Sequence, residues 1–149
     1  MIDYSKLQIE VIKNYLCKGK GITNRFCYKD NGILLTDLDS TIAILIPEDK
    51  FILDTSKFIS NELKSLKDLI KENATQCVDN GLEKFIKPGL TAHRFTYDDK
   101  EFYVDSKKLK LLGYDSTIYT VKTDISKKYP PLQFYIDDNF IGMICPIRP

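Results

Sequence analysis

The sequence predicts an α+β fold, with a predominantly antiparallel sheet and two main helices. Three observations lead to this prediction. Short β-rich runs recur along the chain, and corners rich in Asp, Asn and Gly separate them. Two longer segments carry apolar residues at helical spacing. The order is a helix followed by a strand meander, and later a strand, a short helix and more strands, which is typical of hairpin-built sheets.

The first segment is expected to be a helix. Asp3 or Ser5 can cap it, and Gly19 marks its end. Its apolar stripe consists of Leu7, Val11, Ile12, Tyr15 and Leu16.

Three strands are expected next, over residues 25–29, 33–38 and 41–46. Asn31-Gly32 lies between the first two, and both residues accept the positive φ of a type I′ turn, so a hairpin is expected there. Pro47 ends the third strand.

A second helix is expected after the capping residues 54–56. Its apolar face consists of Ile59, Leu63, Leu66, Leu69 and Ile70. The stretch from Glu72 to Pro88 gives only a weak signal for any element.

The last third of the chain repeats the hairpin pattern. A strand pair flanks Asp98-Asp99, a short helix over 106–112 ends at Gly113, and a strand is expected over 116–123. A final strand pair flanks the corner 137–139. This order predicts a single domain, 1–149, with two weakly duplicated strand–helix–strand halves at about 1–72 and 90–149.

Composition excludes several classes of function. The 22 Lys and Arg balance 21 Asp and Glu, which removes the general electrostatic argument for a dedicated nucleic-acid binder and leaves open only a local basic face. The apolar run at 42–47 is too short to span a bilayer, and residues 1–10 lack a secretory signal. We therefore expect a cytoplasmic protein that does not associate with a membrane.

The four cysteines and the one histidine lack the spacing of a usual zinc site, so free thiols are expected. The aromatic residues on the expected strands can pack in the core and form cross-strand pairs. The alternative is that some of them stack against the bases of a single-stranded nucleic acid on one face of the sheet.

One stretch carries a candidate catalytic motif. Asp37-Leu38-Asp39 follows an apolar strand, and Asp137-Asp138 follows another. Both stretches resemble the acidic motifs of the haloacid-dehalogenase-like superfamily, which implies a nucleophile at Asp37, an acid/base at Asp39 and bound magnesium. Ser40 stands where that family has Gly, and the hairpin pattern predicts instead that all four carboxylates are turn residues. Magnesium-dependent phosphohydrolysis is therefore the alternative function.

The C-terminal segment carries a second resemblance. Pro146, Ile147 and Arg148 follow an apolar strand and are similar to the closing segment of bacterial DNA polymerase sliding clamps. The stretch 32–46, which includes Thr36 to Asp39, and the strand–helix–strand order after Glu101 resemble clamp segments too.

The clamp resemblance implies a non-catalytic interaction module with no cofactor, an accessory of DNA metabolism in a phage or mobile element. It implies a protein partner seated at Pro146, Ile147 and Arg148, and weak DNA contact from lysine-bearing helix faces. These lysines are Lys13, Lys18, Lys64, Lys67 and Lys71. Since a clamp ring needs about six such domains, this chain could encircle DNA only as a homo-oligomer, and the sequence leaves the oligomeric state open.

Overall fold

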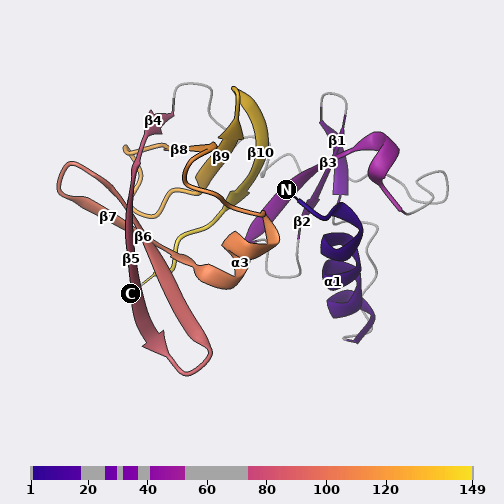
Figure 1. Ribbon diagram of the computed structural model, residues 1–149, viewed down its shortest axis with the longest axis horizontal. Helices are drawn as coiled ribbons and strands as arrows, with labels where there is room; N and C mark the ends of the chain where they lie inside the picture. The colour runs from indigo at the N-terminus through magenta and orange to yellow at the C-terminus, as the bar shows by residue number, and fades with distance from the viewer. Residues whose placement is uncertain (1, 18–25, 30–31, 37–40, 53–73, 149) are drawn as a thin grey trace. The chain divides into compact units, whose positions relative to one another are not determined.

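The computed structural model of the chain describes residues 2–17, 26–29, 32–36, 41–52 and 74–148 (Figure 1). The chain divides into two compact units, Met1–Leu69 and Ile70–Pro149. The single-domain assignment stays a prediction. The expected second helix lies outside the described residues.

The first unit contains a helix and a strand meander. Helix α1 spans Tyr4–Cys17, and the strands are β1 (Phe26–Lys29), β2 (Gly32–Thr36) and β3 (Ile42–Pro47). Strand β2 pairs antiparallel with β1 on one side and with β3 on the other, which confirms the expected strand pair and third strand. The expected turn position of Gly32 is wrong, because Gly32 is the first residue of β2, pairs with Lys29 and has no positive φ. A short 3-10 turn, η1 (Glu48–Lys50), follows β3.

Hydrogen bonds explain where α1 begins and how the helix accommodates the buried side-chain amide of Gln8. Of the two expected caps, Asp3 accepts a hydrogen bond from the Lys6 amide at 3.0 Å. Gln8 is fully buried, which a polar amide tolerates only when it is hydrogen-bonded. Its Nε2 donates to the Lys50 carbonyl at 2.8 Å, and its Oε1 accepts from the Ile52 amide at 2.9 Å. This side chain therefore ties α1 to the segment after β3.

Gly32 is required by the close packing of two strands, in addition to its place beside the hairpin turn. A Cβ atom at this position would lie 2.8 Å from the Ile46 carbonyl oxygen and 3.0 Å from Cδ1 of Leu45. We expect Gly32→Ala to lower the free energy of unfolding by roughly 1–3 kcal/mol, because the backbone of β3 must shift. Urea denaturation of the variant followed by circular dichroism measures this. An unchanged transition midpoint would show that β3 adapts at no cost.

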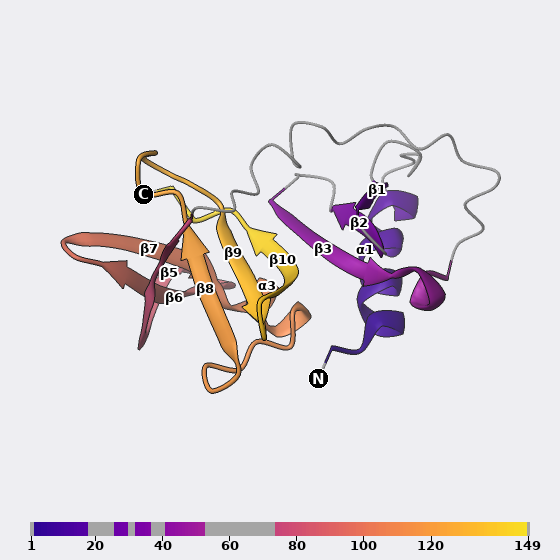
Figure 2. The same cartoon turned by 90° about the horizontal axis from the view of Figure 1, so that it is seen from above.

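The second unit contains the other strands and one described helix. One antiparallel sheet has the order β10-β9-β8-β4, and a second has the order β5-β6-β7 (Figures 1 and 2). The bounds are β4 (Thr75–Gln76), β5 (Val78–Lys87), β6 (Leu90–Tyr97), β7 (Lys100–Asp105), α3 (Ser106–Leu111), β8 (Tyr119–Thr123), β9 (Leu132–Ile136) and β10 (Asn139–Ile144). The predicted α+β class with antiparallel sheets is confirmed.

Acidic corners join the strands of both hairpins in this unit. Asp98 in the β6–β7 turn has a φ of 52°, and Asp137 and Asp138 in the β9–β10 turn have φ values of 47° and 64°. Asp tolerates this left-handed region better than most residues. The prediction that these aspartates are turn residues is confirmed. Gly113, at φ 62°, ends the short helix as expected.

The core of the second unit is an aromatic cluster between its two sheets. Phe134 on β9 is fully buried, and its ring lies 6.1 Å from Phe95 and 5.7 Å from Tyr114, centroid to centroid. Tyr119 on β8 lies 6.4 Å from Phe134. The crossing angles are steep, at 81°, 76° and 73°, which is the edge-to-face geometry that aromatic pairs favour. The rings of Phe95, Phe134 and Tyr119 are buried, so these three are not available for base stacking.

Strands β4 and β5 were not predicted, because both fall in the stretch with the weak signal. Nine of the ten residues of β5 are exposed. Alternating apolar and polar residues identify a strand in a sequence only when the strand buries one of its two faces. Strand β5 buries neither face, so its sequence has no such alternation.

Candidate anion-binding pocket

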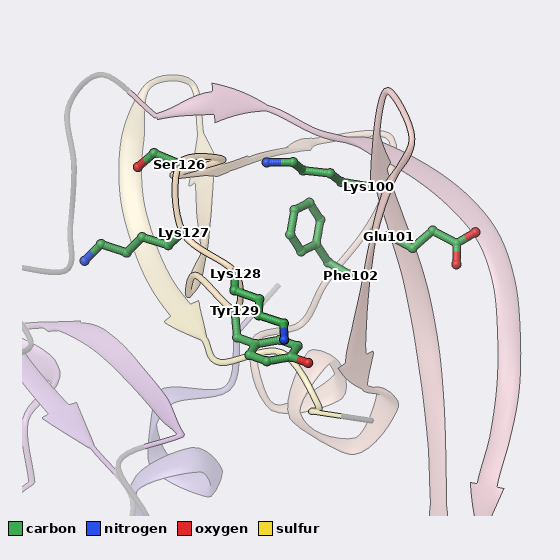
Figure 3. A pocket seen from close by; sticks show the side chains of 7 residues that line it. All are labelled: Lys100, Glu101, Phe102, Ser126, Lys127, Lys128 and Tyr129. Carbon is green, nitrogen blue, oxygen red and sulfur yellow. The ribbon is translucent and has the colours of Figure 1, made fainter.

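A pocket of about 480 Å³ lies in the second unit, between β7 and the segment 124–129 that follows β8 (Figure 3). Its lining is rich in basic side chains and consists of Lys100, Glu101, Phe102, Ser126, Lys127, Lys128 and Tyr129. Figure 3 shows Lys100 and Phe102 pointing from β7 toward this segment, as the alternation of a strand requires.

Hydrogen bonds fix the backbone of segment 124–129. The Asp124 carboxylate accepts from the Ser126 amide at 3.1 Å and from the Ser126 hydroxyl at 2.5 Å, the pattern of an Asx turn. The Lys127 amide donates to the Asp124 carbonyl at 3.2 Å. From β7, on the opposite side of the pocket, the Lys100 ammonium donates a hydrogen bond to the Ile125 carbonyl. The lysine side chains therefore project from an ordered turn rather than from a free loop.

The pocket has an excess of positive charge. Three lysines line it against one carboxylate, that of Glu101. Glu101 is already engaged, because Arg94 Nη1 donates to its Oε1 at 2.8 Å and the Tyr103 hydroxyl donates to its Oε2 at 3.1 Å. Figure 3 shows the Glu101 side chain directed away from the pocket on one side and the Lys127 side chain directed away from Lys100 and Phe102 on the other. An anion in the pocket would thus meet the Lys100 and Lys128 side chains without an opposing free carboxylate, with Lys127 at the rim.

Tyr129 contacts a cation from each of two segments. The Lys128 ammonium and the Arg148 guanidinium carbon each lie 5.4 Å from the centroid of its ring. Arg148 is placed there by the C-terminal segment, whose Ile147 amide donates to the Tyr103 carbonyl on β7 at 2.7 Å. The arrangement therefore holds two cations at one aromatic ring beside the pocket.

The residues expected to bind a partner at the C-terminus differ in their placement. Arg148 is exposed and borders the pocket through Tyr129, whereas Ile147 is half-buried and Pro146 is buried. Pro146 is therefore a packing residue in this structure. Lys13 lies on α1, in a part for which only the backbone is described, and Lys18, Lys64, Lys67 and Lys71 lie outside the described residues.

The carboxylates of the alternative catalytic motif are not brought together by the described part of the chain. Asp37 and Asp39 lie outside it, and Asp137 and Asp138 form the β9–β10 turn. Strand β2, which leads to Asp37, has antiparallel neighbours on both sides, while the dehalogenase-like pattern implies a parallel sheet. The local structure favours the meander interpretation. Among the described residues, no group of three or more His, Cys, Asp and Glu side chains is arranged to hold a metal ion.

A second polar cluster joins Asp79, His93 and Tyr114. Asp79 Oδ1 lies 2.5 Å from His93 Nε2. Asp79 Oδ2 accepts a hydrogen bond from the Tyr114 hydroxyl at 2.6 Å. The Gly81 amide adds a third hydrogen bond at 2.6 Å. Burial alone would raise the pKa of Asp79, but these hydrogen bonds together hold it below its ordinary value. Burial and the Asp79 carboxylate raise the pKa of Tyr114, so its phenol stays neutral.

Sequence reasoning missed both the basic pocket and this polar cluster. Lys100 reaches a carbonyl 25 positions away, and Tyr114 reaches a carboxylate 35 positions away, so neither contact has a local pattern. The consecutive pair Lys127-Lys128 before Tyr129 was the one local signal for the pocket.

Cys77 is a buried thiol, and burial raises its pKa to about 11. Within the described ranges, the helices are too short and too polar for a bilayer crossing. No protein-family model, curated protein or solved structure matches this chain.

Proposed function

We propose that this chain is a non-catalytic binding module whose basic pocket contacts the phosphates of a nucleic acid. The observation that carries the proposal is a pocket lined by three lysines, with Lys128 and Arg148 over the ring of Tyr129. The nearby Glu101 carboxylate is engaged by Arg94. Phosphate contacts of this kind are weak singly and independent of sequence. The near-neutral net charge of +1 suits an accessory with modest affinity better than a tight DNA binder.

The wider setting is also a proposal. The sequence resemblance to sliding clamps supports an accessory role in DNA metabolism, in a phage or mobile element, and Arg148 from that resemblance lies beside the pocket. A cytoplasmic location suits the buried Cys77 thiol. The proposal assigns no cofactor and no catalytic residue to the chain.

Fluorescence anisotropy with a labelled single-stranded oligonucleotide at low salt tests the proposal. We expect binding at micromolar protein, and a decrease of roughly tenfold in affinity for Lys127→Ala/Lys128→Ala. The slope of log affinity against log salt should become shallower by about 1.4, because two phosphate contacts of about 0.7 each are lost. Lys6→Ala/Lys50→Ala is the matched control, since it removes the same charge from exposed positions in the other unit.

Three outcomes would contradict the proposal. One is no binding of the wild-type chain at micromolar concentration. Another is an equal loss in the control variant, which would indicate a general charge effect. The third is an unchanged salt slope in the pocket variant, which would place the phosphate contacts elsewhere.

A further inference from the structure

The dipeptide Asn80-Gly81 lies in a bulge of β5, and both of its residues are exposed. On either side of the bulge, Asp79 pairs with Phe95 and Glu83 pairs with His93. Residues 80–82 of β5 therefore lie opposite a single residue of β6, Arg94. Figure 1 shows these two strands as the long β5–β6 hairpin. Because a bulge interrupts the ladder, the backbone at Asn80-Gly81 is not held by regular strand pairing.

The backbone nitrogen of Gly81 is oriented by the residue two positions before it. Its N–H donates a hydrogen bond to Asp79 Oδ1 at 2.6 Å, and a carboxylate acceptor increases the electron density on the donor nitrogen. Gly81 has a φ of 65°, and among the described residues a Cβ atom at this position would have no neighbour within 4 Å. Since glycine also has no side chain of its own, this nitrogen is open to a reaction with its neighbour.

Two side chains of β6 hold the side-chain amide of Asn80. Asn80 Oδ1 accepts a hydrogen bond from Arg94 Nη2 at 3.2 Å, and Asn80 Nδ2 donates one to Thr96 Oγ1 at 2.8 Å. The guanidinium draws electron density from Asn80 Cγ and stabilises the negative charge that develops on Oδ1 when a nucleophile attacks that carbon. Arg94 is itself held by Glu101 at 2.8 Å, so the cation is in place before the reaction.

We propose that Asn80-Gly81 is a site of self-modification, at which Asn80 is converted to aspartate and isoaspartate. In the first step the Gly81 nitrogen forms a bond to Asn80 Cγ, and the bond between Cγ and Nδ2 breaks. Nδ2 leaves as ammonia with the proton of the Gly81 nitrogen, and a cyclic imide remains. Water then opens the imide at either of its two carbonyl carbons, which gives aspartate or isoaspartate. The two reacting groups are neighbours in the chain, so the first step is intramolecular.

The modification changes the charge of this face of the sheet. A neutral amide beside Arg94 becomes a carboxylate, so the guanidinium then has a carboxylate at Nη2 in addition to Glu101 at Nη1. Isoaspartate also adds one methylene group to the backbone of β5. Because the bulge already interrupts the ladder at this point, we expect the fold to accommodate the longer backbone.

Peptide mapping by mass spectrometry, after incubation at mildly alkaline pH, measures the conversion. The tripeptide Asp-Asn-Gly occurs twice in the chain, at 30–32 and 79–81, so Asn31 is an internal standard with the same local sequence. In urea, where only local sequence acts, the two asparagines should convert at similar rates. In the folded chain, Arg94→Gln should slow conversion at Asn80 by roughly tenfold relative to Asn31, because it removes the cation from Oδ1.

The controls separate the contact with Arg94 from a general effect of charge. Arg148→Gln is the matched variant, since it removes the same charge from an exposed position in the same unit and should leave the rate at Asn80 unchanged. Arg94→Lys keeps a cation and should retain part of the rate. Because Arg94 also binds Glu101, thermal melting by circular dichroism confirms that each variant is folded, and Arg94→Lys gives the comparison where Arg94→Gln is not.

Three results would overturn the proposal. The first is a folded wild-type chain in which Asn80 is not converted. The second is a rate at Asn80 in the Arg94 variants that equals or exceeds the wild-type rate, which would show that the guanidinium protects the amide. The third is an equal loss of rate in Arg148→Gln.

Discussion

Replacing Phe134 by Ala is expected to lower the free energy of unfolding of the second unit by about 3–5 kcal/mol. Phe134 is fully buried, and its ring contacts Phe95, Tyr114 and Tyr119 from two other strands and the turn after α3. Its removal leaves a cavity among side chains that are held by their own strands and so collapse only in part. The loss is large compared with the whole stability of a domain of this size.

Urea denaturation followed by far-UV circular dichroism measures this loss, since the chain contains no tryptophan. Ile118→Ala is the control, because that side chain is exposed and should change the free energy by no more than about 0.5 kcal/mol. A loss below about 1 kcal/mol for Phe134→Ala would show that the two sheets do not pack through this ring.

Replacing Asp79 by Ala should have the second largest effect, a loss of roughly 2–4 kcal/mol at neutral pH. The substitution leaves the Tyr114 hydroxyl, His93 Nε2 and the Gly81 amide without their shared acceptor. Asp79→Asn should cost less, because the amide keeps one acceptor oxygen and a similar shape.

The effect of Asp79 should also depend on pH. The hydrogen bonds hold the folded-state pKa of Asp79 below its ordinary value of 3.8, so the ionised carboxylate stabilises the fold above that pH. This stabilisation decreases as the pH falls through the lowered folded-state pKa. We therefore expect the difference between wild type and Asp79→Ala to be constant near neutrality and to shrink below about pH 4 in urea titrations. A difference that stays constant into acid would show that the carboxylate contributes by shape alone.

The parts of the fold that the sequence predicted are those determined locally. Asp98, Asp137 and Asp138 were expected at corners because their side chains suit turn backbone, and all three have positive φ. The short helix before Gly113 follows from apolar spacing and a glycine stop in the same way.

The parts that the sequence did not predict depend on tertiary contacts. The exposed apolar residues of β5 give no alternating pattern, so its pairing with β6 was not visible before the structure. His93 was set aside as an isolated histidine, and its partner Asp79 lies 14 positions away on that unrecognised strand. The pocket required β7 and the segment 124–129 to meet, and no local periodicity encodes that meeting.

The buried Gln8 amide has a consequence for how the first unit opens. It joins α1 to the Lys50 carbonyl and the Ile52 amide across more than forty positions of sequence. Fraying of α1 that withdraws this side chain breaks both hydrogen bonds at once, so opening at one end of the connection loosens the other. We therefore expect the start of α1 and the segment after η1 to open together in hydrogen exchange, although nothing in the order of the sequence makes them neighbours.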